Sequence, residues 1–407
     1  MWTGTIAGEL AEAPAKGICE ETFRANPVYE LVLLDQLPAP EQELLGALRD
    51  DPNFFGLIRP RSTTGLTTKA VCRETAELFT FLQMPGFLPT FAVDMPDSEI
   101  TISRLVCDGV LQIAQGSEWI CGPAACHAYN RAPTEETGRI LAALSLQAIK
   151  HAASLEGADG ADLSGRLYRY NTLPLTPQWL RRIPDGAALE EYLQIQVGGS
   201  CRKGIDQDWT RSTLTANQEV WLAWDSRTVP AQRIDAVGYK LYVSPLPAHL
   251  REVFRLSIPA ITAARAHHFK IGSNVRGLLR PDKMVAYFHD RPALEEAASR
   301  IANELSGCPG QGVPFTAELS SGALLSWASD PPSETAVPVW LRTQSWRQWV
   351  CDRLGSALAV AKREKSAPMP AWSFALERLR LEGVDVTTWA PVSTSWQTKP
   401  AGKFESY

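Results

Sequence analysis

Long apolar segments are missing from this sequence of 407 residues. No run approaches the roughly 18 apolar residues that a helix needs to cross a bilayer. The first 17 residues, MWTGTIAGELAEAPAKG, lack the basic-then-apolar order of a secretory signal. An excess of basic residues is missing too, since 40 Lys and Arg stand against 45 Asp and Glu, a formal net charge of −5. We therefore expect a cytoplasmic protein whose partners include neither a membrane nor a nucleic acid.

Recognisable metal and nucleotide motifs are also missing. The eight cysteines are scattered, and the spacing of the closest pair, Cys121 and Cys126 in CGPAAC, fits no common zinc pattern. Buried free thiols are the expected state of such cysteines in a cytosolic protein. The run VGGSCRKG at 197–204 lacks the GxxxxGK[ST] order of a phosphate-binding loop, so we interpret it as a turn. The sequence predicts neither a metal site nor a cofactor.

The patterning that is present predicts three parts. We expect an N-terminal α+β domain over residues 1–235, a core over 236–332, and a C-terminal helical segment with an irregular tail over 333–407. Apolar residues at helical spacing predict the clearest helices, at 66–83, 134–155, 344–364 and 373–383. The helix at 344–364 has a tryptophan-rich apolar face, which is typical of core packing.

Two segments of the N-terminal domain carry strand-like patterns. Residues 99–116 and 117–122 follow the helix at 66–83 and predict a β-hairpin, an order that in part resembles a winged helix. No basic recognition helix accompanies it, which favours a packing or peptide-binding role over DNA binding. Further on, the alternation in GRLYRY at 165–170 predicts a strand that leads into a proline-bounded loop.

The stretch from Tyr239 to Asp290 differs from the rest of the chain in charge. It carries eight Lys and Arg against three Asp and Glu, about +5 in an acidic protein, and four of the six histidines. A local cationic, histidine-rich patch of this kind indicates an anionic ligand, with phosphate as the leading candidate.

Alternation along this stretch predicts how its side chains divide between two faces. The expected order is strand, helix, strand, loop, strand, helix, strand, strand. Lys240 and Tyr242 fall on one face of the first strand, His268 and Lys270 on one face of the second, and Lys283 on one face of the third. A sheet with one solvated face would show the same alternation. We predict an α+β fold in which helices pack on one face of an antiparallel or mixed sheet, with helical N- and C-terminal extensions.

The segments YKLYVSP, HHFKIG and NVRGLLRPDKMVAYF, in this order and spacing, resemble the core of the phosphothreonine lyase family. That family includes secreted bacterial effectors and the lyase domains of class III and IV lanthipeptide synthetases. Its pattern pairs a Lys-x-His strand with a Phe-Lys strand, an arginine-containing loop and a lysine-containing strand. The resemblance covers roughly Tyr239 to Leu325. It implies β-elimination of phosphate from phosphothreonine or phosphoserine, without metal or cofactor.

This chemistry accounts for the residue types that the resemblance assigns. A base must take the weakly acidic Cα proton, so a lysine must be held neutral by burial or by neighbouring cations. The resemblance makes Lys270 this base and makes Lys240 the cation that stabilises the peptide carbonyl. Phosphate needs fixed cationic partners, and Arg276, Arg280 or Lys283 would supply them.

The sequence departs from the family pattern at two places. Tyr242 stands where the family has the histidine that acts as general acid, so the acid is either Tyr242 or His268. The segment ALLSWASD at 323–330 lacks the family's later arginine. The predicted function is a phosphoserine/phosphothreonine lyase that acts on a ribosomally made peptide. Its partner would be a separate kinase, because no kinase motif set is present. The alternative is a non-catalytic protein that binds a phosphopeptide or a leader peptide.

Overall fold

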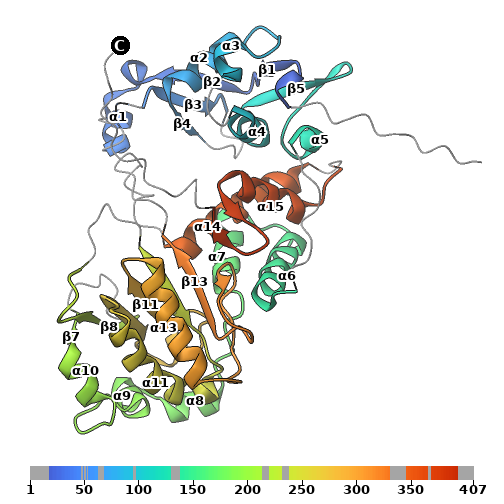
Figure 1. Cartoon of the computed structure of the whole chain (residues 1–407). Coiled ribbons are helices and arrows are strands. Elements are labelled where there is room, and N and C mark those ends of the chain that lie inside the picture. Colours follow the sequence, from blue (N-terminus) through green and yellow to red (C-terminus); the bar gives the residue numbers. More distant parts are fainter. Residues whose placement is uncertain are drawn as a thin grey trace, which may run out of the picture. The chain divides into compact units, whose positions relative to one another are not determined.

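The structure is a computed structural model that describes residues 18–46, 49, 52, 54–62, 68–94, 98–129, 138–212, 220–231, 238–330, 345–364 and 368–392. It divides into two compact units (Figure 1). The first comprises residues 1–132 with 364–370, and the second comprises 133–363 with 371–407. The second unit therefore spans both positions, near 235 and 332, at which the sequence suggested a domain boundary. None of the helices in the described residues is long and apolar enough to cross a membrane.

The first unit is built from two three-stranded antiparallel sheets and short helices. One sheet has the order β1-β5-β6 and the other β2-β3-β4. The strands are β1 (Phe23–Ala25), β2 (Tyr29–Leu33), β3 (Gly56–Pro60), β4 (Lys69–Val71), β5 (Leu111–Gln115) and β6 (Glu118–Ile120). The helices are η1 (Ile18–Glu20), η2 (Leu34–Gln36), α1 (Ala39–Leu45), α2 (Arg73–Phe81), α3 (Thr90–Val93), α4 (Ser98–Cys107), η4 (Gly122–Ala125) and α5 (Cys126–Tyr129).

The first half of the segment predicted as a strand at 99–116 is helical, so that part of the prediction is wrong. Residues 98–107 form α4, and only 111–115 are extended, as β5. Ile102 and Val106 lie one helical turn apart and are both fully buried, so tertiary packing outweighs the strand propensity of the β-branched residues. The hairpin itself is present as β5 and β6.

The second unit is organised around a seven-stranded antiparallel sheet of order β12-β13-β9-β11-β10-β8-β7. The α+β class predicted from the sequence is confirmed. The strands are β7 (Trp209–Arg211), β8 (Trp221–Ser226), β9 (Tyr239–Val243), β10 (His268–Gly272), β11 (Met284–Phe288), β12 (Ala317–Glu318) and β13 (Leu325–Ser329). The helices between them are η5 (Pro247–His249), α11 (Leu250–Ala263), α12 (Val275–Leu278) and α13 (Arg291–Glu304). The order from β9 to β13 is the one that the sequence predicts.

Helices α11 and α13 lie side by side across one face of this sheet (Figure 1). Their buried residues Phe254 and Ile301 share one apolar core with Leu241, Phe269 and Ala286 of the three central strands. The cations of those strands alternate with these apolar residues and therefore lie on the opposite face. The expected division between the two faces is confirmed.

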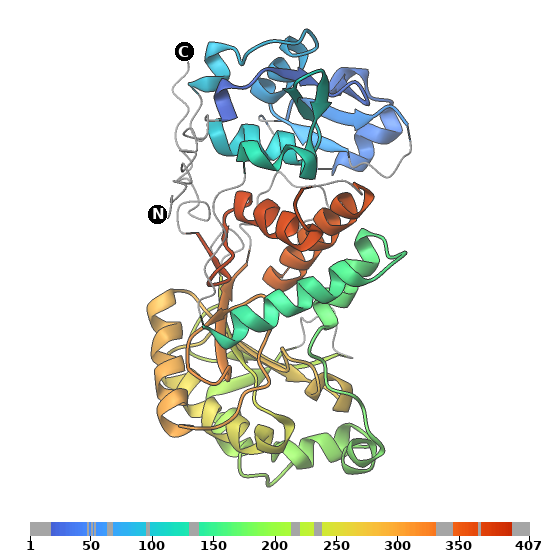
Figure 2. The ribbon, with the colours of Figure 1, turned by 90° about the vertical axis from the view of Figure 1, so that its right-hand side faces the viewer.

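Further helices of this unit flank the sheet: α6 (Ile140–Ser154), α7 (Gly160–Arg169), α8 (Pro177–Arg182), α9 (Gly186–Leu193), α10 (Arg202–Asp208), α14 (Trp346–Arg363) and α15 (Ala371–Leu381). A small hairpin, β14 (Val384–Asp385) with β15 (Ala390–Pro391), follows α15. Figure 2 shows α6, in green, next to the red pair α14 and α15, and the three helices pack on one another. The predicted helices at 134–155, 344–364 and 373–383 correspond to α6, α14 and α15, although 134–137 and 344 lie outside the described residues.

Helix α7 replaces the strand that the sequence predicts at 165–170. The Asp159 side chain accepts a hydrogen bond from the Asp162 amide and caps the helix. Leu163 and Leu167, at helical spacing, are both buried. A Cβ atom at Gly355 would lie 2.8 Å from the Ser164 nitrogen, so the glycine permits α14 to pack closely against α7. This crossing brings side chains of both helices to the open face of the sheet.

Candidate active site

A cavity of about 490 Å³ opens on the sheet face that α11 and α13 leave uncovered. Its lining includes two lysines, two arginines, three tyrosines, a tryptophan and an aspartate, so it is both polar and aromatic. The lining residues are Tyr168, Val220, Trp221, Lys240, Tyr242, Lys270, Arg280, Asp282, Val285, Tyr287, Ser345, Arg347 and Gln348. The sheet supplies the floor, α7 and α14 supply one wall, and the loop before β11 supplies another.

Strand register arranges the floor of the cavity in rows. Val285 of β11 pairs with Tyr242 of β9 on one side and with Lys270 of β10 on the other. Two residues further along, Tyr287 pairs with Lys240 on one side and with His268 on the other. Side chains at directly opposed positions stand on the same face of a sheet. In the first of these rows, Lys270 lies on one side of Val285 and Tyr242 on the other.

Lys270 is the amine of the cavity that lacks a counterion. Its Nζ lies 4.4 Å from the centre of the Trp221 ring and 5.6 Å from that of Tyr287. Among the described residues it has no hydrogen-bond or ion-pair partner. Burial, together with the nearby charge of Lys240, lowers the pKa of Lys270 to about 8. A substantial fraction of this amine is therefore neutral slightly above neutral pH.

Lys240, in contrast, is paired. Its ammonium forms an ion pair with Asp330, which follows β13, and lies 5.2 Å from the centre of the Tyr287 ring. The Tyr287 ring therefore lies within reach of both lysines, and both lysines line the same cavity. Lys240 is a fixed positive charge beside the free amine of Lys270.

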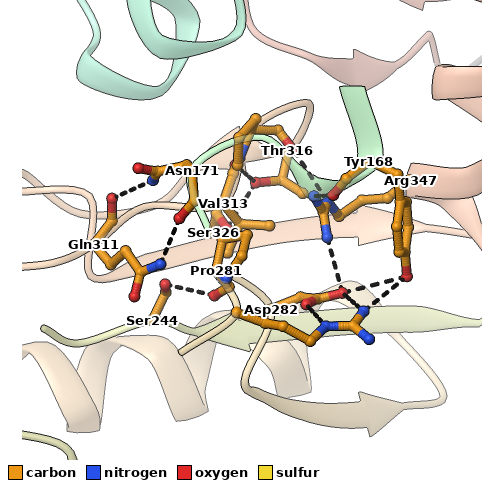
Figure 3. Close-up of polar contacts among 12 residues, drawn as sticks. Tyr168, Asn171, Ser244, Pro281, Asp282, Gln311, Val313, Thr316, Ser326 and Arg347 are labelled. Carbon is orange, nitrogen blue, oxygen red and sulfur yellow. Dashed lines mark hydrogen bonds and ion pairs between the residues drawn. The ribbon is translucent and has the colours of Figure 1, made fainter. Parts of the chain in front are cut away.

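Asp282, which lines the cavity, forms ion pairs with two arginines, Arg280 and Arg347, and Figure 3 shows its carboxylate beside Arg347. Arg280 contacts its carboxylate through two nitrogens, each at 2.8 Å, and Arg347 Nη1 lies 2.8 Å from Asp282 Oδ2. Arg280 also donates to the Tyr168 hydroxyl at 3.1 Å, and Arg347 donates to the Tyr168 carbonyl at 2.8 Å. Burial alone would raise the pKa of Asp282, but Arg347 and Arg280 outweigh burial and hold that pKa below its ordinary value.

The two arginines differ in what they can offer a ligand. Arg347 is almost fully buried, and Asp282, Tyr168 and Pro314 engage its three nitrogens. Arg280 uses only Nε and Nη2, so its Nη1 has no partner among the described residues. Arg280 is therefore the arginine with a donor left for an anion, while Arg347 contributes charge and rigidity.

Three of the seven residues expected at the site lie outside the cavity lining. Lys283 is fully buried, and its Nζ donates to the Pro245 carbonyl at 2.9 Å and to Gln311 Oε1 at 2.5 Å. Arg276 is exposed on α12. His268 pairs its Nδ1 with Asp225 at 2.7 Å. Alternation places Lys283 and His268 on the cavity side of the sheet, but their hydrogen bonds to Pro245, Gln311 and Asp225 hold them outside the cavity lining.

Several lining residues were not predicted from the sequence. Arg347 and Tyr168 come from segments that the sequence places outside the core, and long-range packing leaves no local signal. Trp221 is the first residue of β8. The Arg-Pro-Asp order at 280–282 places a carboxylate two residues after Arg280, which the sequence assigns to phosphate binding, and could have suggested the ion pair between Arg280 and Asp282. Arg347 also supplies a cavity arginine where β13 has none.

No cluster of three or more metal-ligating side chains occurs among the described residues. Cys121 and Cys126 are free thiols, and burial raises the pKa of each. The charged groups that line the cavity are two amines, two guanidinium groups and the carboxylate of Asp282. Such a set can bind an anion and exchange a proton.

No protein-family model and no curated protein matches the chain. Two solved structures are similar to it. One is an effector protein from Pseudomonas syringae pv. tomato strain DC3000, with 15% identity, a TM-score of 0.36, and coverage of 61% of this chain and 98% of that chain. The other is an effector protein from Pseudomonas syringae pv. syringae strain 61, with 14% identity, a TM-score of 0.38, and coverage of 62% and 99%. Similarity of this order does not transfer an activity.

Proposed function

We propose that this protein is a lyase that eliminates phosphate from phosphoserine or phosphothreonine in a peptide. The observation that carries the proposal is Lys270, an unpaired amine with a pKa of about 8 in a cavity with three other cationic side chains. Phosphate elimination needs this combination, because a neutral base and a cationic binding site must act on the same residue.

Each step of the reaction has a candidate side chain. Neutral Lys270 takes the Cα proton, and the electrons of that bond form the Cα=Cβ double bond. The Cβ–O bond breaks, and its electrons leave with the phosphate. Lys240, fixed by Asp330, stabilises the negative charge that develops on the peptide carbonyl. Arg280 holds the departing phosphate, and the product peptide contains a dehydroamino acid.

The alternative is a protein that binds a phosphopeptide without converting it. One observation favours this alternative: among the described residues, the cavity lining contains no histidine, the residue type that the resembled lyase family keeps as its acid. The ribosomal origin of the peptide and the separate kinase remain predictions from the sequence.

Mass spectrometry of a phosphothreonine peptide separates the two functions. Incubation with the protein should remove the mass of phosphoric acid, and Lys270→Met should abolish this loss. Lys203→Met, at an exposed lysine outside the cavity, is the matched control and should leave the rate unchanged. Tight binding of the peptide with unchanged mass would instead establish the binding protein. If the protein neither binds nor converts the peptide, both functions are refuted.

A further inference from the structure

Elimination of phosphate needs a proton for the departing oxygen, and His268 is poorly placed to give one. Its Nδ1 is engaged by Asp225, and its ring lies edge-on against Tyr287 at 5.1 Å between centres. It does not line the cavity. Its pKa is also lowered, chiefly by burial, so the charged form that could donate is disfavoured at neutral pH.

Tyr242, unlike His268, lies in the cavity lining. Its side chain lines the cavity, and its hydroxyl has no hydrogen-bond partner among the described residues. Tyr242 and Lys270 both pair with Val285, so they flank this valine on the same face of the sheet. Their backbones are roughly 10 Å apart, twice the spacing of neighbouring strands.

This spacing suits a base and an acid that act on adjacent atoms of one residue. Lys270, Val285 and Tyr242 all line the cavity, and the short Val285 stands between the two longer side chains, so that the cavity has a gap above Val285. A phosphorylated residue in this gap would direct its Cα–H bond toward Lys270 and its phosphate toward Tyr242 and Arg280. Resting on the proposed lyase function, we propose that Tyr242 donates the proton to the departing phosphate.

The protons taken up and released in this step balance. Lys270 gains the Cα proton while the Tyr242 hydroxyl gives its proton to the phosphate oxygen freed from Cβ. A fully deprotonated phosphate is a strong base and can take a proton even from a phenol. The proton on Lys270 then returns to the phenolate, directly or through water, and the enzyme is restored without net uptake.

The local environment keeps the Tyr242 hydroxyl protonated. Burial, followed by the charge of Asp330, raises the pKa of Tyr242 well above its ordinary value. The phenol thus remains protonated over the whole range in which Lys270 becomes neutral, with a pKa of about 8. A tyrosine donor predicts a rate that rises with pH through about 8 and does not fall again just above that pH.

The test compares Tyr242→Phe with His268→Asn on two peptides, one with phosphothreonine and one with sulfothreonine. Sulfate leaves without a proton, so it removes the need for a donor. We expect Tyr242→Phe to slow phosphate loss by about 100-fold or more while sulfate loss changes little. His268→Asn should leave both rates within a few-fold of the wild-type protein.

A second variant gives a readout that a merely structural role would not move. Tyr242→His places a group with an ordinary pKa of about 6.5 at the donor position, while Lys270 becomes neutral only near its pKa of about 8. The rate should therefore level off between about pH 6.5 and 8 and fall above about 8, where the wild-type rate does not fall. A wild-type rate for Tyr242→Phe on phosphothreonine, or a selective loss of phosphate elimination in His268→Asn or Tyr287→Phe instead, would overturn the assignment while leaving the lyase intact. A wild-type protein that converts neither peptide would refute the lyase, and the donor assignment with it.

Discussion

Arg347 of α14 and Asp282 of the loop before β11 form a buried ion pair, with Arg347 Nη1 2.8 Å from Asp282 Oδ2. The pair connects two segments that the sequence assigns to different parts of the chain. Asp282 also holds Arg280 at the cavity, so one carboxylate links the packing of α14 to the geometry of the anion-binding side chain.

Asp282→Asn should therefore affect both stability and activity. The substitution keeps the shape but leaves the buried Arg347 without its counterion, and loss of one partner of a buried pair costs about 3–5 kcal/mol. We expect the free energy of unfolding, measured in urea, to fall by about this amount. Glu296→Gln, which breaks the exposed pair between Glu296 and Arg300, is the control and should change it by less than about 0.5 kcal/mol. Equal effects of the two substitutions would contradict the anchoring role of Asp282.

Lys240→Met should raise the pKa of Lys270. Lys240 is a positive neighbour that disfavours the charged form of Lys270, and its removal also frees the negative charge of Asp330. Both changes favour the ammonium, so the midpoint near pH 8 should move to higher pH. Titration of the lysine side chains by NMR measures this without any assay of activity. A midpoint that stays in place or moves down would show that burial alone sets the pKa.

Lys283→Met tests a buried lysine that the sequence assigned to phosphate. The substitution leaves the Pro245 carbonyl and Gln311 Oε1 without their donor, which should reduce the free energy of unfolding by about 1–3 kcal/mol. Affinity for a phosphopeptide, measured by calorimetry, should not change. Arg280→Gln should show the reverse pattern and weaken the affinity.

Burial gives Lys283 a pH signature as well. Its pKa is about 7 in the folded protein, against about 10.4 for an unfolded lysine. Between these values the unfolded chain binds more protons, so the contribution of Lys283 to the free energy of unfolding grows as pH rises from about 7 to about 10.4. This part of the rise should be missing in Lys283→Met. An unchanged pH dependence would indicate that Lys283 is not buried in solution.

Gly355→Ala should disturb the cavity from a distance. A Cβ atom at this position would lie 2.8 Å from the Ser164 nitrogen and closer still to the Gly160 carbonyl oxygen, so α14 and α7 must separate. Overpacking of this kind costs about 1–3 kcal/mol, and the displaced helices carry Arg347 and Tyr168 away from the site. Gly204→Ala in α10 meets no atom within 4 Å and should be neutral or stabilising. Thermal unfolding and the elimination rate of both variants give the comparison.

The sheet floor of the site was largely predictable because its signal is local. Strand alternation places Lys240, Tyr242 and Lys270 on one face from sequence alone, and apolar residues at helical spacing place α11 and α13 on the other. The structure confirms both. Local pattern failed for α4 and α7, where buried contacts with distant segments override strand propensity.

The sequence by itself determined the fold class, the order of elements from β9 to β13 and the residue types of the floor, because periods of 2 and 3.6 residues specify which face of an element is buried. Only the tertiary structure decided which cations reach the cavity. Lys283 donates a hydrogen bond to the Pro245 carbonyl and lies outside the cavity lining, and Arg276 is exposed to solvent. Arg347, in contrast, reaches the cavity from α14. It also decided that Lys270 stays unpaired while Lys240 meets Asp330, because a pKa depends on burial and charge in space rather than on neighbours along the chain.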